Sequence, residues 1–446
     1  MNNLTIFEKV KDWIRNSITL KLIAITILML LLLIPVSMIQ SIINERANLH
    51  EQATREVSSK WADEQQINGP ILTIPIIYLN KTDKETVETT RYLHLLPDRL
   101  NIKGQIDPET LHRGIYEVVV YRSAIEITGN FVLKFRIDQN NLKAIRYDQA
   151  FLTIGISDLR GIKNDPAVHW GDQVFRVSPG SRNPDLVRSG ITIGIPDLEN
   201  NMGNKVSFGF KLSLQGSHNL SFIPVGRTNE ISITSAWATP SFSGNFLPDS
   251  RSITHQGFKA NWKILQLNRN YPQAWTGHSV SSQDMASSAF GVDLLLSIDN
   301  YKKSHRSAKY AVMTIALTFL IFFLVEIRTK KKIHPFQYAL IGLALSLFYI
   351  LLVSITEHSS FSLAYIISTV GISGMIFFYS LAVFNKKKHS ILLLLTLIGL
   401  YSFLFVVLQL EDYALLMGSL GLMVILAATM YFTRNVNWYN MSNDTN

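Results

Sequence analysis

Apolar residues gather in six long runs, one near the start of the chain and five in its last third. The first run, residues 22–39, contains Pro35 but no charged residue. At the rise of an α-helix it spans about 27 Å, close to the hydrocarbon thickness of a bilayer. A cleavable signal peptide is the alternative, but the run is long for one, and no small-residue cleavage site follows it. We therefore interpret it as an uncleaved membrane helix.

The five later runs predict a bundle of further membrane helices. They cover residues 310–325, 336–355, 361–384, 391–410 and 413–432. The first is short and would rely on Lys309 and Arg328 reaching the membrane surface. No proline or ionisable residue interrupts the five runs, which argues against the broken helices and buried charges of an ion-coupled transporter. Gly342 with Ser346, and Ala414 with Gly418, offer small-residue helix contacts.

Charge is distributed around these runs in a way that predicts their orientation. The net charge is +9, and most of it flanks the apolar segments, so it indicates membrane topology and not nucleic-acid binding. The flanking basic residues are Lys9, Lys11, Arg15, Lys21, Arg328, Lys330, Lys331, Lys332, Lys386, Lys387, Lys388 and Arg434. The alternate short loops carry Glu357 and then Glu411 and Asp412, with no Lys or Arg. We expect six spans with both termini in the cytoplasm, which would place the large domain in the bacterial periplasm.

Charged residues at the outer ends of the predicted spans form a speculative site. Glu357 and His358 follow one span, and Glu411 and Asp412 lie between the last two. A basic cluster, Lys302, Lys303, Arg306 and Lys309, precedes residue 310 and opposes the charge rule, although long domains translocate largely regardless of charge. The acidic residues could bind a cation or pair with this cluster, the cluster could meet anionic lipid headgroups, and simple solvated loops are the alternative.

Residues 42–309 follow a different pattern, typical of a water-exposed domain. Ile42, Leu49, Val57 and Trp61 share one helical face, which predicts that the first helix continues as a stalk until Gly69-Pro70. Alternation then predicts strands over residues 71–79, 117–137 (with a turn at Gly129-Asn130), 205–223 (with a break at Gly216), 231–237 and 258–267. Residues 164–185 are rich in Pro, Gly and Asp and predict a long loop.

The expected fold class is therefore an α+β membrane protein. It would comprise a cytoplasmic tail (1–21), a first span (22–41), a mainly antiparallel β domain with a stalk helix (42–309), a five-helix membrane bundle (310–432) and a second cytoplasmic tail (433–446).

Catalytic motifs are not evident in the sequence. There is no cysteine, which excludes disulfides and thiolate ligands. The signatures of zinc proteases, serine hydrolases, P-loops and dinucleotide sites do not occur. Gly216-Ser217-His218 is better interpreted as a turn at a strand end than as part of a triad. We expect no catalytic residue, metal or other cofactor.

Several segments, in order along the chain, resemble the CreD family of bacterial inner-membrane proteins. They are Ser58-Ser59-Lys60-Trp61, residues 66–72, Arg113-Gly114-Ile115-Tyr116-Glu117, Ser157-Asp158-Leu159-Arg160-Gly161, Pro240-Ser241-Phe242-Ser243-Gly244, residues 268–275, residues 306–312, residues 334–338 and residues 354–358. The resemblance covers roughly residues 20–432. Gly114, Gly161 and Gly244 suit tight turns, and Trp61, Trp237 and Trp275 suit a core.

The resemblance implies a role in cell-envelope integrity in Gram-negative bacteria, with links to a two-component system, colicin tolerance and envelope or β-lactam stress. It implies no defined reaction or catalytic residue. We expect a non-enzymatic inner-membrane protein whose partners are membrane lipids and other envelope proteins, with no nucleic acid. The alternatives are a membrane-embedded envelope enzyme, a lipid-handling protein or a small-molecule exporter.

Overall fold

The protein is described by a computed structural model that covers residues 18–81, 86–196, 198–294, 299–329, 333–384, 387–410 and 413–434. The chain divides into two compact units. The helical unit comprises Met1–His50 and Ser297–Asn446, and the β unit comprises Glu51–Leu296. Each unit has its own hydrophobic core.

Helix α2 (Ile18–Trp61) is continuous for 44 residues and includes Pro35. It crosses the boundary between the units, so the predicted continuation of the first apolar run into a longer helix is confirmed. The helix ends at Trp61 and not at Gly69-Pro70, because residues 65–81 already form the first strand, β1. The polar link between helix and strand is only three residues long.

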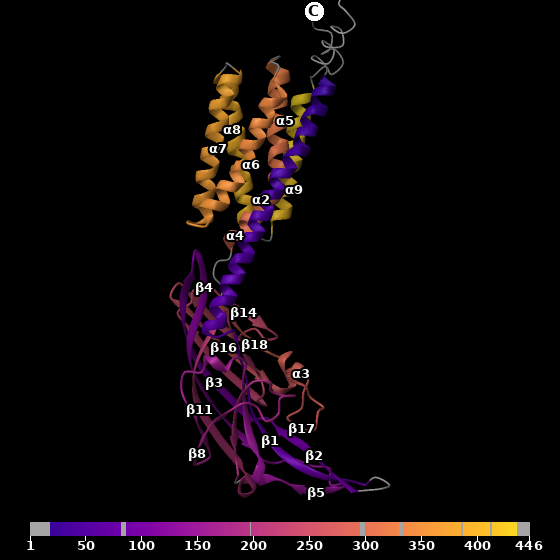
Figure 1. Ribbon diagram of the computed structural model, residues 1–446, viewed down its shortest axis with the longest axis vertical. Helices are drawn as coiled ribbons and strands as arrows, with labels where there is room; N and C mark the ends of the chain where they lie inside the picture. Colours follow the sequence, from indigo (N-terminus) through magenta and orange to yellow (C-terminus); the bar gives the residue numbers. More distant parts are fainter. Residues whose placement is uncertain are drawn as a thin grey trace, which may run out of the picture. The chain divides into compact units, whose positions relative to one another are not determined.

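The rest of the helical unit consists of the short helix α4 and of helices α5 to α9, which run side by side in Figure 1. Their bounds are α4 (Asp299–Lys309), α5 (Ala311–Thr329), α6 (Pro335–Thr356), α7 (Phe361–Phe384), α8 (Lys387–Gln409) and α9 (Ala414–Thr433). In the described residues, four helices are long and apolar enough to cross a membrane: α2, α6, α7 and α8. The bent pair Lys303–Lys309 and Ala311–Ile327, with an angle of 44°, would make a fifth. Residues Leu416–Tyr431 form a shorter apolar helix.

Close helix packing in this unit depends on glycine at two places. A Cβ on Gly342 of α6 would lie 2.2 Å from Cδ1 of Leu32 of α2, so this glycine allows the two helices to approach, as its small size predicted. Gly418 of α9, in contrast, has no neighbour within 4 Å where a Cβ would stand. It is Gly421 that faces the ring of Phe403 of α8. The small-residue contact predicted at Gly418 is therefore wrong by one helical turn.

The β unit is built from strands that form two sheets. The strands are β1 (Gln65–Lys81), β2 (Thr86–Leu95), β3 (Arg99–Arg113), β4 (Tyr116–Val132), β5 (Leu142–Ile145), β6 (Phe151–Ile156), β7 (Ala167–Trp170), β8 (Gln173–Arg176), β9 (Ser178–Pro179), β10 (Gly190–Gly194), β11 (Lys205–Ser217), β12 (Asn219–Ile223), β13 (Thr228–Ser235), β14 (Pro240–Gly244), β15 (Ser250–Thr254), β16 (Gly257–Leu265), β17 (Ala274–Thr276) and β18 (Phe290–Leu294). Short helical elements connect some of them: η1 (Tyr147–Gln149), η2 (Leu159–Gly161), η3 (Leu198–Asn201), η4 (Gln266–Asn268) and α3 (Ser282–Ala286).

Within the described residues, one sheet has ten strands and the other has eight. The ten-stranded sheet runs β14-β18-β12-β1-β6-β10-β9, with β2, β5 and β17 joined beside β1 and β2. The eight-stranded sheet runs β15-β16-β13-β3-β4-β11-β7-β8. Most pairs are antiparallel, as expected, but β1 pairs with β12 and β3 pairs with β13 in parallel. The unit is therefore a mixed-sheet structure.

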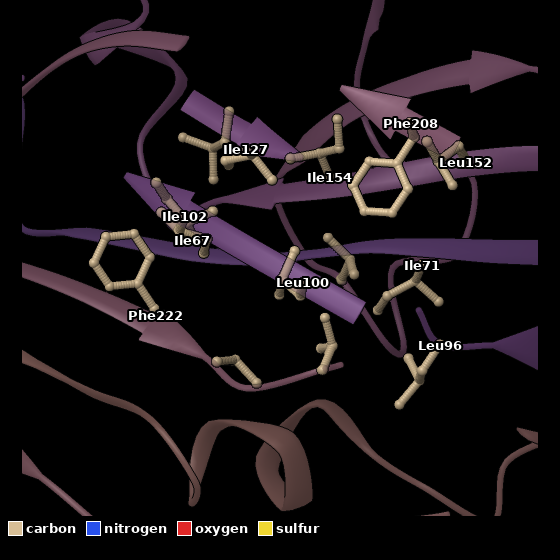
Figure 2. Close-up of a cluster of buried hydrophobic side chains, with 14 of the residues drawn as sticks. Ile67, Ile71, Leu96, Leu100, Ile102, Ile127, Leu152, Ile154, Phe208 and Phe222 are labelled. Atoms are coloured by element: carbon tan, nitrogen blue, oxygen red, sulfur yellow. The ribbon is translucent and has the colours of Figure 1, made fainter. Parts of the chain in front are cut away.

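A single hydrophobic core joins the two sheets (Figure 2). Ile67, Ile71 and Phe222 come from the ten-stranded sheet, and Leu100 and Phe208 come from the eight-stranded sheet. Alternation places these side chains inward, and in β11 it leaves the intervening Lys and Ser residues exposed. The unit is therefore a β-sandwich whose two inner faces form one apolar layer.

Two glycine positions that predicted breaks lie inside paired strands instead. Gly129 lies near the end of β4, where a Cβ would stand 2.1 Å from the Arg99 carbonyl and 2.6 Å from the ring of Phe208, so glycine permits close approach of the neighbouring strands and does not mark a turn. Gly69 is in β1 at a register shift, with φ +112°. The long loop predicted over residues 164–185 contains β7, β8 and β9.

Candidate functional site

The start of β1 forms a dense polar site that we call the α2–β1 junction. Its centre is Gln65, which is fully buried. The Gln65 amide donates to the carbonyls of Asp158 (3.0 Å) and Gln215 (2.9 Å), and its oxygen accepts from the Asp158 backbone N–H (3.3 Å). These bonds tie β1 to η2 and to β11 of the other sheet. Since a buried amide must keep its hydrogen bonds, this side chain fixes three segments at once.

An ion pair of Asp158 with Arg160 completes the junction. The guanidinium donates to both Asp158 oxygens, with the shortest distance 2.6 Å, and reaches the Asp63 carboxylate at 3.1 Å. It also donates to the Ser59 carbonyl at the end of α2. Asp158 additionally accepts from the Asp63 N–H. The bound guanidinium of Arg160, helped by these backbone N–H groups, lowers the pKa of Asp158 to about 2.

Two glycines at the junction leave no space for a side chain. A Cβ on Gly161 would lie 2.3 Å from the Gln215 carbonyl and 2.4 Å from the Gln65 amide. A Cβ on Gly216 would lie 2.3 Å from the Tyr121 hydroxyl, which donates to the Asn219 carbonyl. Gly161 is thus required for close approach and not for a turn, whereas Gly114 and Gly244 have the positive φ that tight turns need.

Acidic groups near the junction do not form a metal centre. Burial, together with the carboxylates of Asp293 and Asp63, raises the pKa of Glu64. Asp293 accepts a hydrogen bond from the Asn219 amide. Across the part of the chain that the structure describes, no group of three or more His, Asp or Glu is arranged to hold a metal ion. The junction therefore acts as a clamp that holds the end of α2 on the sandwich.

Ser217 and His218 lie where the chain leaves one sheet for the other. Ser217 ends β11, Asn219 begins β12, and His218 between them has φ +57°. The Ser217 N–H donates to the Asp63 carbonyl and the His218 N–H donates to the Val119 carbonyl. The expected turn at a strand end is confirmed, although it falls at His218 and not at Gly216. Ser217 and His218 therefore form the turn by which the chain passes from one sheet of the sandwich to the other.

A second polar group surrounds His94 of β2, which is 2% exposed. Nδ1 lies 3.1 Å from the Thr73 hydroxyl, Nε2 lies 3.3 Å from the Asn183 amide, and the ring packs on Trp275 at 5.2 Å. Because the Asn183 amide donates, Nε2 accepts and Nδ1 carries the proton, which gives a neutral ring. Burial, with a smaller contribution from His278, lowers the pKa of His94 to about 4. His94 is therefore a neutral core histidine.

The segment 268–275 lies next to His94 through Trp275 and makes its own network of contacts. Arg269 is buried and donates to the carbonyls of Tyr271 (2.5 Å) and Val225 (3.1 Å) and to the Gln273 side chain (2.6 Å). Its guanidinium also lies over the Tyr271 ring at 4.2 Å. Burial lowers the pKa of Arg269. These contacts give this motif a structural role.

The residues of the speculative outer site make separate contacts in the helical unit. Arg306 of α4 donates to the Leu410 carbonyl (2.9 Å) beyond α8, and Lys303 lies 3.4 Å from the Gln409 side chain. These two cations interact favourably with the partial negative charge at the carboxyl end of α8. Glu357 instead pairs with Arg46 of α2 at 3.3 Å. His358 and Lys309 are exposed, while Glu411, Asp412 and the side chain of Lys302 lie outside the described residues.

One ionisable residue of the bundle was missed at the sequence level. The predicted span ended at Val325, but α5 continues to Thr329, so Glu326 belongs to the helix and is 6% exposed. Its carboxylate accepts from the Tyr338 hydroxyl (2.9 Å) and from the Ile333 N–H (2.8 Å). The carboxylate therefore ties the end of α5 to the start of α6. The signal available in the sequence was a single acidic residue among the basic residues that follow the run.

The apolar helices and the β-sandwich define an α+β membrane protein with one helical unit and one large β unit. Residues 17–439 match the family described as Inner membrane protein CreD. The chain is also 33% identical over 419 residues to Inner membrane protein CreD of Escherichia coli (strain K12), covering 93% of this chain and 92% of that protein. The chain belongs to the CreD family.

Replacement of Asp158 by Asn should destabilise the β unit, because the Arg160 guanidinium would lose the nearer of its two charged partners and keep only Asp63. We expect the free energy of unfolding to fall by about 1–3 kcal/mol. Asp148→Asn is the matched control, since Asp148 also pairs with an arginine two residues away, Arg146, but at an exposed site. Denaturant unfolding of the full chain in detergent measures both; equal losses would contradict a special role for the junction.

Acid should weaken the β unit between pH 6.5 and 4. The folded pKa of His94, about 4, lies below its ordinary value of 6.5, so in this window the unfolded chain binds the extra proton and stability falls as pH falls. The loss at pH 4 is up to about 3 kcal/mol. When the free energy of unfolding is measured at several pH values in this range, it should depend less on pH for His94→Gln than for the wild type. It should keep its wild-type pH dependence for His112→Gln, an exposed histidine; an unchanged pH dependence in both variants would refute the assignment.

Proposed function

We propose that this protein crosses the inner membrane six times, exposes its β unit to the periplasm and maintains the cell envelope in a non-enzymatic role. The observation that carries the orientation is the placement of basic residues on alternate short connections along the sequence. The two helical segments beyond the four clear spans are α4 with α5, and α9. An inner-membrane location agrees with the name of the Escherichia coli relative, Inner membrane protein CreD.

The non-enzymatic part of the proposal is supported by how the reactive side chains are used. In the described β unit, His94 and Asp158 both have lowered pKa values, of about 4 and about 2. Both side chains are engaged in contacts that hold segments of the β unit together. Ser217 and His218 form a corner between two sheets. The envelope role itself rests on the resemblance to the CreD family. These structural contacts are consistent with a structural or interaction role, which requires no reaction.

Reporter fusions test the orientation. Alkaline phosphatase, which is active only after export, should be active when fused after Gln139, Ser359 or Asp412. It should be inactive after Lys332 or Lys388, because these positions lie among the basic residues that remain in the cytoplasm. Fusions of a cytoplasm-active reporter at the same five positions provide the control, with the opposite result. Strong phosphatase activity after Lys388 would exclude the six-span arrangement.

Complementation tests the role. A strain lacking this protein should release periplasmic enzymes under envelope stress, and the wild-type chain should prevent the release. Ser217→Ala and His218→Asn should prevent it equally well, since neither side chain serves a reaction and Asn tolerates a positive φ. Gly161→Val, which places a side chain where there is no room, is the structural control and should fail. Loss of protection by Ser217→Ala at a normal protein level would instead indicate a hydrolase.

A further inference from the structure

The outer face of the eight-stranded sheet carries two adjoining hollows, which we call the sheet trough. Their volumes are about 540 Å³ and 500 Å³. The first lies over β4, β7 and β11, and the second lies over β16, β13, β3, β4 and β11. Both are lined by Glu126 and Lys211, so they meet at this pair. The trough faces away from the core, and the groups that line it are available to a ligand.

Strand register explains why charges gather in the trough. Lys103 of β3 stands opposite Glu126 of β4, and Glu126 stands opposite Lys211 of β11, so the three form one row across the sheet. Lys259 of β16 lines the same hollow from the other side. Glu126 and Lys211 are 3.9 Å apart and their side chains are 47% and 82% exposed, which makes a weak pair. Three lysines therefore meet one carboxylate, and the trough is basic.

The exposed neutral side chains of the lining are polar or small, whereas its large apolar residues are buried in the core: Phe208, Phe210, Ile125 and Leu212. The row next to Glu126 contains the neutral residues Thr234, Gln105, Ala124 and Ser213, in the order of the strands β13, β3, β4 and β11, and it ends at Lys259 of β16. Ser232 and His169 add further polar groups. Ala124 lies in the middle of this row, which keeps the floor of the trough low. Hydroxyl and amide groups of this kind exchange hydrogen bonds with a hydroxylated ligand, whereas they offer no pocket for a large apolar side chain.

The length of the trough indicates a linear ligand. It reaches from β16 to β7, which are five strand spacings apart in the sheet order. Strands lie about 4.8 Å apart, so the trough is about 24 Å long. A ligand that crosses it would contact side chains from six strands. A chain of several sugar units has this length and presents hydroxyls along its whole course.

We propose that the sheet trough binds a linear anionic glycan, whose acidic groups pair with Lys103, Lys211 and Lys259 and whose hydroxyls bond to the neutral row. Positive charge calls for an anionic occupant, and the Ser, Thr and Gln groups favour a glycan over an acidic peptide, which would need apolar anchor sites. Binding of the glycan to Lys211 would release its weak pair with Glu126. This site does not depend on which side of the membrane the β unit occupies.

Binding of a labelled hyaluronan oligomer to the full chain tests the site. The protein is held in nanodiscs of phosphatidylcholine, whose neutral headgroups do not compete. The triple variant K103Q/K211Q/K259Q should bind about tenfold more weakly, since three modest ion pairs are lost together. The control K60Q/K134Q/K143Q changes net charge equally at exposed lysines outside the trough and should bind like the wild type. Thermal unfolding of each variant confirms that it is folded.

A further variant and two further ligands distinguish a glycan site from a non-specific charge effect and from a peptide site. Ala124→Glu, which fills the floor of the trough with a negative charge, should also weaken hyaluronan binding by about tenfold. A neutral dextran oligomer should bind weakly to every variant. Equal losses in both triple variants would show a non-specific charge effect and overturn the site. Tighter binding of polyglutamate than of hyaluronan would overturn the glycan assignment in favour of an acidic peptide.

Discussion

The β unit depends on the requirement that a buried amide side chain keep its hydrogen bonds. Gln65 stands at the first residue of β1, the strand that pairs with β12, β2, β5 and β6. Its two carbonyl partners belong to the η2 segment and to β11 of the opposite sheet. If Gln65 moved, the two sheets would lose one of their polar connections near the end of α2, and only bonds such as that from the Tyr121 hydroxyl to the Asn219 carbonyl would remain. The bonds of Asp158 and Arg160, and the absence of side chains at Gly161 and Gly216, all serve to keep it in place.

Local patterns predicted the apolar helices and some of the strands, because such patterns report on burial, which is a local property of a helix or strand. Strands β2, β3 and β6, among others, were not predicted. The apolar runs correspond to α6, α7 and α8, and the alternation of residues 205–214 corresponds to β11. Glycine was a further source of error. A glycine permits a turn, but it also permits close approach of another chain segment. At Gly129 the neighbours are the Arg99 carbonyl and the Phe208 ring, which are both distant in sequence, so no local pattern could distinguish the two uses.

The polar sites were harder to predict, since each joins segments that are distant in sequence. The family motif at residues 157–161 was visible, but its contacts to Ser59, Gln65 and Gln215 were not. Charge alone offered the basic cluster as a partner for Glu357, whereas its observed partner is Arg46 of α2. The sheet trough was invisible for a related reason: Lys103, Lys211 and Lys259 are adjacent only through strand register. In each case the pairing of elements, and not the residue type, creates the site.

Helix α9 differs from the other long helices in how little of it is enclosed by protein. It packs against α8 through Gly421 and Phe403, while most of its described side chains are exposed, including Leu416, Val424 and Met430. In the proposed six-span arrangement, the energy that holds this helix would come from lipid more than from the bundle. Its 20 residues extend about 30 Å, the typical hydrocarbon thickness. Its placement would therefore follow the match between helix length and bilayer thickness, so that thicker membranes strain α9 before they affect α6 or α7.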